Sequence, residues 1–289
     1  MREALMDQTL GCVCFVAGVS RFFLRTSDSR IQSHCDRLDE FKQASKHMQD
    51  HGSSDSDPPL SIPILLEDPW FFVLNKPVHL LTQAPAGIPN LQSSLVSQLQ
   101  KPNAPTPFIG IPHRLDRMTS GAVVVARNQR ALRRLCDQFA ARTVNKIYLA
   151  WIHGTPKPSD TLVDSIRKVP DEPRAEVVEE NAPGARIASL EYETLLTRSD
   201  PNGSAITLVK IRLGTGRMHQ IRLQFGCRKH PILGDTLYGS QSPWGTRPDH
   251  FREPPMALHA WQIDFHHPKT AERITVTAPV PSEFPWSLP

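Results

Sequence analysis

The sequence predicts an α+β fold with a largely antiparallel or mixed β-sheet. Short apolar runs typical of strands are mixed with short amphipathic segments typical of helices, and they do not follow a regular βαβ repeat. The 27 prolines among 289 residues favour many loops and strand ends over long helices. Because 39% of the residues are hydrophobic, the chain can bury a sizeable core.

Residues 1–61 differ in composition and hydrophobic pattern from the rest of the chain. They are predicted to be an N-terminal extension and linker, partly disordered. The stretch 50–61, DHGSSDSDPPLS, is polar and rich in Ser and Pro, so it breaks helices. Residues 30–49 could form a short helix, but its apolar face is thin. Asp39 lies there in an Arg-Leu-Asp triplet among other charges, which is typical of a solvated surface. We therefore expect the folded domain to span 62–289.

The first elements of this domain are predicted to be a strand pair and a helix. In IPILLEDPWFFVLNKP, residues 62–77, two apolar runs flank Glu-Asp-Pro and the second stops at Lys-Pro, which predicts strand, turn and strand. Residues 90–100 carry leucine at every fourth position. Asn90 is a suitable N-cap for them, so a short helix is expected.

The next stretch, PHRLDRMTSGAVVVARN at 112–128, joins a polar turn to a buried strand. Gly121 ends the polar part, and the run AVVVA after it predicts a strand inside the core. Asn128 is then expected to cap a helix over 129–142, whose apolar residues share one face. The segment VNKIYLAWIHG, at 144–154, predicts another strand.

The second half of the chain is expected to contain two hairpins and a helix. Residues 155–185 are turn-rich and weakly patterned, so loops are expected there. Residues 186–196 and 204–216 predict a hairpin connected by TRSDPNG. A helix is predicted to begin in MHQIRLQFGC at 218–227, and a turn-rich loop follows in HPILGDTLYG at 230–239. The segments LHAWQIDFHHP and ERITVTAPVP predict a final hairpin.

Composition and missing motifs exclude several classes of protein. The net charge of +4 and the pI of about 8.9 permit a nucleic-acid partner without requiring one. The five cysteines are odd in number and scattered, which favours free thiols in a reducing compartment and hence a cytoplasmic protein. No apolar run approaches the roughly 20 residues that cross a bilayer.

Motifs for nucleotide or metal binding are not evident. Nucleotide-binding loops and HExxH are absent, and His266 and His267 lack the spacing of metal ligands. His259 is expected to be a structural hydrogen-bonding residue. We therefore expect no metal and no cofactor.

Asp116 is the residue in HRLDRMTSG that could carry chemistry. It stands immediately before a turn that leads into a buried strand, and such a rim can hold a carboxylate rigidly in a cleft. A carboxylate kept ionised by a nearby arginine can act as a nucleophile. On spacing alone, an Asp that caps the turn is an equally good interpretation. A second acid placed as a retaining glycosidase requires is not evident.

The segment HRLDRMTSG closely resembles the signature of the RluA-type RNA pseudouridine synthases. Further segments similar to that family follow the same order: ILLEDPWFFVLNKPVHLLT, VNKIYLAWIHG, LGTGRMHQIRLQF, HPILGDTLYG and LHAWQIDFHHP. The resemblance covers about 62–281, with Met118 standing where the family usually has Asp. It implies one catalytic domain whose two halves share a long mixed sheet, with flanking helices and a central active cleft. It also implies a cofactor-free isomerisation of uridine, in which the glycosidic bond breaks and the uracil rejoins through C5.

The resemblance assigns roles to five residues by motif match. Asp116 would be the catalytic carboxylate, attacking ribose C1′ or uracil C6 or abstracting a ribose proton; the sequence leaves all three open. Tyr148 would stack on the target base and help to manage a proton. Arg222 would pair with Asp116 and hold it ionised. Ile221 could contribute to an apolar base pocket, and His219 would brace the loop.

The same resemblance implies RNA as the partner, either ribosomal RNA or tRNA, bound by a monomer without an obligate protein partner. Arg114 would enter the base stack as the uridine flips out, or contact a phosphate. Arg117 and Arg217 could face phosphates or be solvated. The same applies to a further set of basic residues: Arg130, Arg133, Arg134 and Lys229. A non-catalytic protein that binds or folds RNA with the same basic cleft is the alternative hypothesis.

Overall fold

The computed structural model describes residues 61–85, 87–242, 244–245 and 255–281. The predicted extension over 1–61, including the short helix considered at 30–49, lies outside the described residues apart from Ser61. The domain boundary at 62 therefore stays a prediction. Across the described ranges, no helix is both long and apolar enough to span a membrane.

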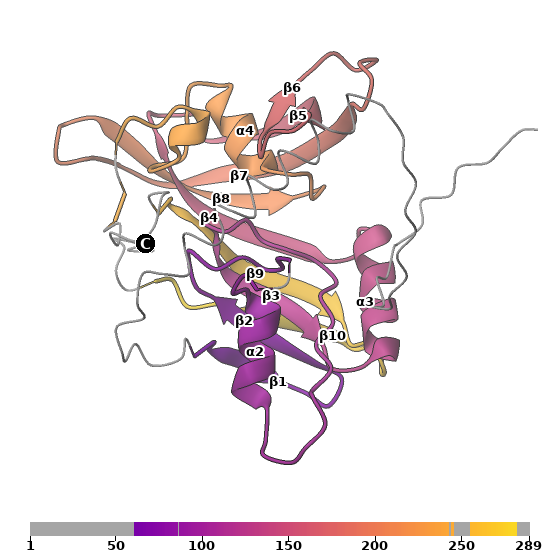
Figure 1. Ribbon diagram of the computed structural model, residues 1–289. Helices are drawn as coiled ribbons and strands as arrows, with labels where there is room; N and C mark the ends of the chain where they lie inside the picture. Colours follow the sequence, from indigo (N-terminus) through magenta and orange to yellow (C-terminus); the bar gives the residue numbers. More distant parts are fainter. Residues whose placement is uncertain (1–60, 86, 243, 246–254, 282–289) are drawn as a thin grey trace, which may run out of the picture. The chain divides into compact units, whose positions relative to one another are not determined.

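In the described part of the chain, ten strands form one sheet in the order β1-β2-β3-β9-β4-β8-β7-β5-β6, with β10 paired to β9 (Figure 1). The strands are β1 Ile64–Glu67, β2 Phe71–Lys76, β3 Ser120–Ala126, β4 Asn145–His153, β5 Ser159–Lys168, β6 Ala175–Val177, β7 Arg186–Ser199, β8 Ala205–Leu213, β9 Leu258–His266 and β10 Arg273–Thr277. The helices are α2 Leu91–Leu99, α3 Gln129–Ala140, α4 Gln220–Gly226 and the 3₁₀ turn η1 Thr236–Tyr238. Neighbouring strands are antiparallel except β3 and β9, which are parallel. The predicted α+β class with a mixed sheet is confirmed.

The predicted hairpins are confirmed, but one loop expectation is wrong. β1 pairs with β2, β7 with β8 and β9 with β10, whereas 155–185 contains β5 and β6 instead of loops alone. In β5 the buried residues Leu162 and Ile166 flank Asp164, and Val163 on the opposite side is exposed. This breaks the alternation of polar and apolar residues by which a strand is recognised. Pairing with β7 along eight consecutive residues decides the conformation of β5 in place of its own pattern.

Helices α2 and α3 cover opposite faces of β2 and β3. The buried leucines of α2 share one cluster with alternate residues of these strands: Leu91, Leu95, Phe72, Leu74, Val123 and Val125. The buried residues of α3 share a second cluster with the residues in between: Ala131, Leu135, Phe71, Val73 and Val124. Both predicted N-caps are confirmed, because the Asn90 side chain accepts from the Ser93 amide at 3.0 Å and the Asn128 side chain accepts from the Ala131 amide at 2.8 Å.

The two halves of the sheet join where β3 meets β9 for two residue pairs. Gly121 has φ of 111°, and a Cβ on it would stand 2.2 Å from the Ala260 carbonyl oxygen. Only glycine therefore allows the two strands to approach this closely. Beside it, Ser120 Oγ lies 2.8 Å from Nδ1 of the buried His259. His259 thus has the structural role expected, and the polar turn before β3 is fixed at the centre of the sheet.

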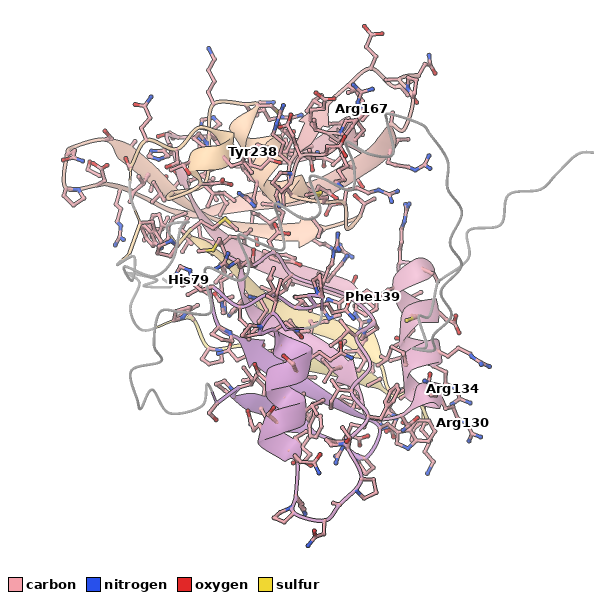
Figure 2. All side chains as sticks on the ribbon, in the orientation of Figure 1. His79, Arg130, Arg134, Phe139, Arg167 and Tyr238 are labelled. Carbon is pink, nitrogen blue, oxygen red and sulfur yellow. The ribbon has the colours of Figure 1, made fainter. Side chains whose placement is uncertain are left out.

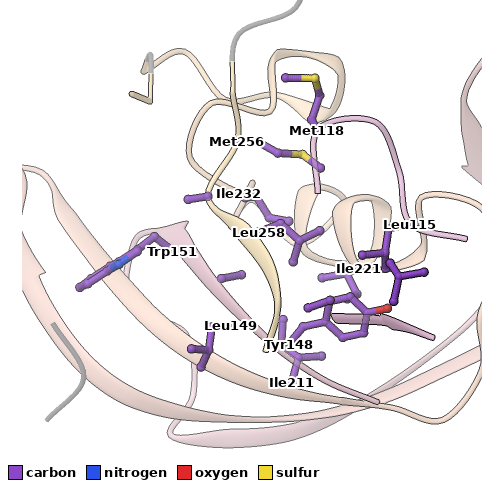
Figure 3. Close-up of a cluster of buried hydrophobic side chains, with 14 of the residues drawn as sticks. Leu115, Met118, Tyr148, Leu149, Trp151, Ile211, Ile221, Ile232, Met256 and Leu258 are labelled. Atoms are coloured by element: carbon purple, nitrogen blue, oxygen red, sulfur yellow. The ribbon is translucent and has the colours of Figure 1, made fainter. Parts of the chain in front are cut away.

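The core beneath this junction is apolar and includes two predicted site residues, Tyr148 and Ile221. Figure 3 shows the Tyr148 ring beside Ile211 and Ile221, with Leu258 close by. Met118 is buried at the far side of the same cluster, near Met256. The residue after Arg117 therefore contributes to the core and not to the polar surface of the turn.

Candidate active site

Asp116 stands in a turn whose backbone is held on both sides. The Thr119 amide donates to the Asp116 carbonyl at 3.1 Å. Leu115 is fixed by Thr82, whose hydroxyl accepts from the Leu115 amide at 3.1 Å and donates to its carbonyl at 2.9 Å. On the other side, the ammonium of Lys76 donates to the Arg117 carbonyl at 3.2 Å. The Asp116 side chain is 31% exposed, so it reaches the solvent-filled cleft from a rigid support.

Lys76, at the end of β2, is a site residue that sequence reasoning missed. It is fully buried, and its ammonium also donates to the Pro77 and Leu80 carbonyls, both at 2.8 Å. Burial lowers the pKa of Lys76 to about 7, with the charge of Asp116 opposing and that of Arg117 adding to the shift. The Asn-Lys-Pro segment was recognised in the sequence, but only the structure shows that its lysine is buried and bonded to three carbonyl oxygens.

The stability of the protein should rise with pH between about 7 and 10 because of Lys76. In the unfolded chain Lys76 has its ordinary pKa near 10.5, so in this window the unfolded state binds one more proton than the folded state. The free energy of unfolding then rises by up to about 1.4 kcal/mol per pH unit. Urea unfolding at pH 7, 8 and 9 should show this rise in the wild type and its loss in Lys76→Met.

Lys210→Met is the matched control, since Lys210 forms an ion pair with Glu193 on β7. Its unfolding curves should keep the wild-type dependence on pH. Equal slopes in wild type and Lys76→Met would contradict the assignment of the titration to Lys76.

Tyr148 lies in the middle of β4, opposite Ile211 of β8. Its side chain is buried, and burial raises the pKa of Tyr148, with the negative charge of Asp116 acting in the same direction. The phenol therefore stays protonated over the working range of pH. It can present an aromatic face and a hydroxyl donor beside Asp116, but it is poorly suited to accept a proton as phenolate.

Arg222 enters the site from α4 and is shared between two carboxylates. Its Nη1 lies 3.7 Å from Asp116 Oδ2, close enough for an ion pair and too long for a hydrogen bond. Its Nε and Nη2 donate to Asp235 at 2.7 and 2.8 Å, in a buried bidentate pair. Burial alone would lower the pKa of Arg222, but the hydrogen bonds and charge of Asp235 raise it. Asp235, a residue of the loop HPILGDTLYG, was not predicted from the sequence as the partner of Arg222.

An aromatic pair completes the surroundings of Arg222. Its guanidinium lies over the Tyr238 ring, 5.1 Å from the centroid. The Tyr238 hydroxyl is 3.0 Å from His219 Nδ1, and His219 Nε2 is 3.9 Å from Asp116 Oδ2. His219 has φ of 49° at the start of α4, so its backbone turns the chain into the helix. These contacts place His219 between Tyr238 and Asp116, and its role as a brace of the loop stays a prediction.

Two cavities meet at Asp116. The first has a volume of about 440 Å³ and contains Tyr148 and Ile221 in its lining. The second has a volume of about 680 Å³ and contains Met118 and Asp235. Five residues line both cavities: Arg114, Leu115, Asp116, His219 and Arg222. Volumes of this size are typical of sites for small molecules or single nucleotides.

The residues predicted to bind substrate divide between these cavities. Ile221 and Arg217 line the first, Arg117 lines the second, and Arg114 and His219 line both. Arg117 donates from Nε to the His79 carbonyl at 3.3 Å, which directs it away from the first cavity.

The basic residues predicted on α3 lie outside both cavities. Figure 2 shows Arg130 and Arg134 toward the N-terminal end of α3, away from Phe139, which lines the first cavity. Arg130 and Arg133 are exposed, and Arg134 donates to the Pro268 carbonyl. Two cations that sequence reasoning did not select, Arg142 and Lys146, line the first cavity instead.

Among the residues that the structure describes, no group of three or more His, Cys, Asp or Glu side chains is arranged to hold a metal ion.

Comparisons with known proteins agree on one family. Residues 70–226 match the model of the family described as RNA pseudouridylate synthase. The ribosomal large subunit pseudouridine synthase D of Xanthomonas campestris is 36% identical over 236 residues, which cover 78% of this chain and 68% of the relative. The dual-specificity RNA pseudouridine synthase RluA of Escherichia coli is 34% identical over 218 residues, covering 75% of this chain and 92% of the relative. The solved structure of human RNA pseudouridylate synthase domain containing 1 superposes with a TM-score of 0.60 at 26% identity, covering 78% and 86% of the two chains.

Proposed function

This chain belongs to the RluA-type RNA pseudouridine synthases, which isomerise uridine to pseudouridine in RNA, and we propose that Asp116, Tyr148 and Arg222 carry out that reaction. The observation that carries the proposal is the position of the Asp116 carboxylate where the two cavities meet, 3.7 Å from Arg222 and against Tyr148. The residues needed come from the turn before β3, from β4 and from α4, so the complete fold assembles them.

The reaction exchanges one bond to the ribose for another. The bond from C1′ to uracil N1 breaks, a bond from C1′ to C5 forms, the proton leaves C5 and N1 gains one. A uridine stacked in an RNA helix hides these atoms, so the nucleotide has to turn out of the stack to enter the first cavity. Asp116 supplies the carboxylate at the reacting face, and its rigid turn keeps that carboxylate in place while the uracil reorients.

Tyr148 and Ile221 shape the space for the base. Both are buried and line the first cavity on the side of β4 and α4. The Tyr148 ring offers a stacking surface, and its protonated hydroxyl offers a hydrogen bond to a uracil oxygen. Ile221 excludes water next to it, which strengthens the interactions of Asp116 within the cavity.

Arg222 presents a positive charge to Asp116 from a position that Asp235 fixes. Since the bidentate pair uses Nε and Nη2, Nη1 stays directed toward Asp116, 3.7 Å from its Oδ2. Arg114, exposed and lining both cavities, is placed to occupy the gap in the base stack or to contact a phosphate.

The RNA substrate can be identified by tritium release from RNA labelled at uracil C5, because bond formation at C5 expels that hydrogen. Large-subunit ribosomal RNA and tRNA, each transcribed with the label, should be incubated with the purified chain. We expect release of one tritium per target site from one or both RNAs. RNA binding without release from either RNA, or from total cellular RNA, would instead support the non-catalytic alternative.

A further inference from the structure

Three cations that line the first cavity lack the carboxylate partner that eight other described surface cations have. Eight described surface cations form ion pairs with acids, as Arg127 does with Glu67 and Arg273 with Asp264. Arg142, Lys146 and Arg217 line the cavity, and within the described residues none of the three forms an ion pair with a carboxylate. Asp116 is the sole acid among the residues that line this cavity.

Arg142 occupies a backbone position that favours glycine. It follows the last residues of α3 with φ of 57°. Its amide donates to the Phe139 carbonyl at 3.2 Å, and the Thr143 amide donates to the Gln138 carbonyl at 3.1 Å. These two bonds make a Schellman motif in which Arg142 is the left-handed residue, a place usually taken by glycine because a Cβ is strained there. Glycine would end helix α3 at this position with less strain. The arginine found there instead places a guanidinium group at the first cavity.

Lys146 and Arg217 line the same cavity from two other elements. Lys146 is two residues before Tyr148 on β4, so both side chains leave the strand on the same side. A Cβ on Gly216 would stand 3.4 Å from the Lys146 ammonium, which places that ammonium directly against the loop that carries Arg217. The Arg217 Nε donates to the Ile187 carbonyl at 3.2 Å, which fixes the guanidinium beside the loop.

The three charges repel one another in the free protein. Burial lowers the pKa of Lys146, and the charge of Arg142 adds to that effect. Burial also lowers the pKa of Arg217, again with Arg142 contributing. The nearby His113 adds no further positive charge, because burial and Lys146 lower its pKa to about 3 and keep it neutral. An anion in this cavity would relieve the repulsion.

We propose that Arg142, Lys146 and Arg217 together bind one phosphodiester of the RNA backbone next to the target uridine. This inference rests on the proposed function, because the same cavity holds the uridine. A phosphodiester carries one negative charge on two free oxygens, and guanidinium and ammonium groups are its usual partners. The three groups converge from the end of α3, from β4 and from the loop before α4. They would hold the backbone on one side of the nucleotide, while Asp116 and Arg222 act on the other.

The substitution Arg142→Gly separates this binding role from any structural role. Glycine relieves the backbone strain at the left-handed position, so the melting temperature should stay the same or increase. Affinity for a synthetic RNA stem-loop with uridines in its loop should fall about tenfold, as expected for a lost charge-assisted bond. The slope of log affinity against log salt should become shallower by about 0.7 to 0.9.

Arg130→Gln is the matched control, because Arg130 is an exposed arginine of the same helix and lies away from the cavity. It should leave both the affinity and the salt slope close to wild type. An equal loss in Arg130→Gln and Arg142→Gly would mean that the basic surface acts only diffusely, and would overturn the proposal.

A scan of uncharged methylphosphonates along the same stem-loop tests whether a single phosphate is bound. At one position next to the target uridine, the uncharged linkage should weaken binding to wild type about tenfold and binding to Lys146→Met hardly at all. Losses of equal size for both proteins at every position would contradict the proposal. Because the readout is binding, this result is independent of tritium release. If one phosphate position weakens binding to wild type but not to Lys146→Met, and no tritium is released, only the proposed function is refuted. If tritium is released but no position distinguishes the two proteins, only this inference is refuted.

Discussion

Asp116→Asn should abolish pseudouridine formation while the protein stays folded and binds RNA. The amide has almost the same shape as the carboxylate, and the bonds that hold the turn use backbone groups of residue 116 and its neighbours. What disappears is the negative charge and with it the carboxylate oxygen that could attack a carbon atom or accept a proton. Removal of a single essential catalytic group lowers turnover by about 10⁴-fold or more. Tritium release in single-turnover conditions measures this loss directly.

Two further measurements make this result specific to the chemistry. The melting temperature of Asp116→Asn should be close to that of wild type, and its affinity for the substrate RNA should be equal or higher, since a negative charge near the RNA is removed. Pseudouridine formation at the wild-type rate would refute the role of Asp116. Loss of activity together with unfolding would show that Asp116 is a turn-capping residue, the alternative that its sequence position left open.

Asp235→Ala should destabilise the protein by about 3–5 kcal/mol, because it leaves the buried guanidinium of Arg222 without its bidentate partner. The Asp235 side chain is 1% exposed and that of Arg222 is 8% exposed, so water cannot replace the lost bonds. The same change frees Arg222 to move from Asp116, and turnover should fall as well. Urea unfolding gives the free energy, and activity assays below the unfolding transition give the effect on turnover.

Asp264→Ala is the control for the loss of an ion pair as such. Its partner Arg273 reaches into solvent, with 62% of its side chain exposed, and such pairs contribute little to stability. The control should therefore unfold almost as wild type does. If Asp235→Ala also unfolded almost as wild type does, the ion pair of Arg222 with Asp235 would not stabilise the protein. A different residue would then have to position Arg222.

Local pattern was sufficient for most elements of the fold. Asn90 and Asn128 marked helix starts because their side chains replace missing backbone partners in the first turn, which is a local interaction. β3 was recognisable because its residues are buried on both faces and read as a continuous apolar run. β5 was not, because Asp164 interrupts its buried side and is satisfied by Gln224 and Arg228 of a distant segment. Such compensation is invisible until the segments meet.

The three proposed catalytic residues could be selected from the sequence, whereas the roles of the residues around them could not. Asp116, Tyr148 and Arg222 were selected by resemblance of short motifs, and the structure brings them to one cavity. Lys76 and Asp235 lay within recognised segments, but their roles depend on partners 41 and 13 residues away along the chain, namely Arg117 for Lys76 and Arg222 for Asp235. Arg130, Arg133 and Arg134 were selected for RNA and Arg142 was not, because charge alone does not tell which end of a helix faces a cavity.

The sequence by itself determined the family and the order of most elements, and it singled out Asp116 as the candidate carboxylate, since these depend on neighbouring residues and on motifs kept in order. The tertiary structure decided how the charges are distributed. Arg222 is bound mainly to Asp235 and only secondarily to Asp116, and Lys76 is buried beneath the turn. The cations that line the first cavity include Arg142 and Lys146, which the sequence did not single out. The physical reason is that electrostatic interaction depends on distance and burial in space, which a one-dimensional pattern does not contain.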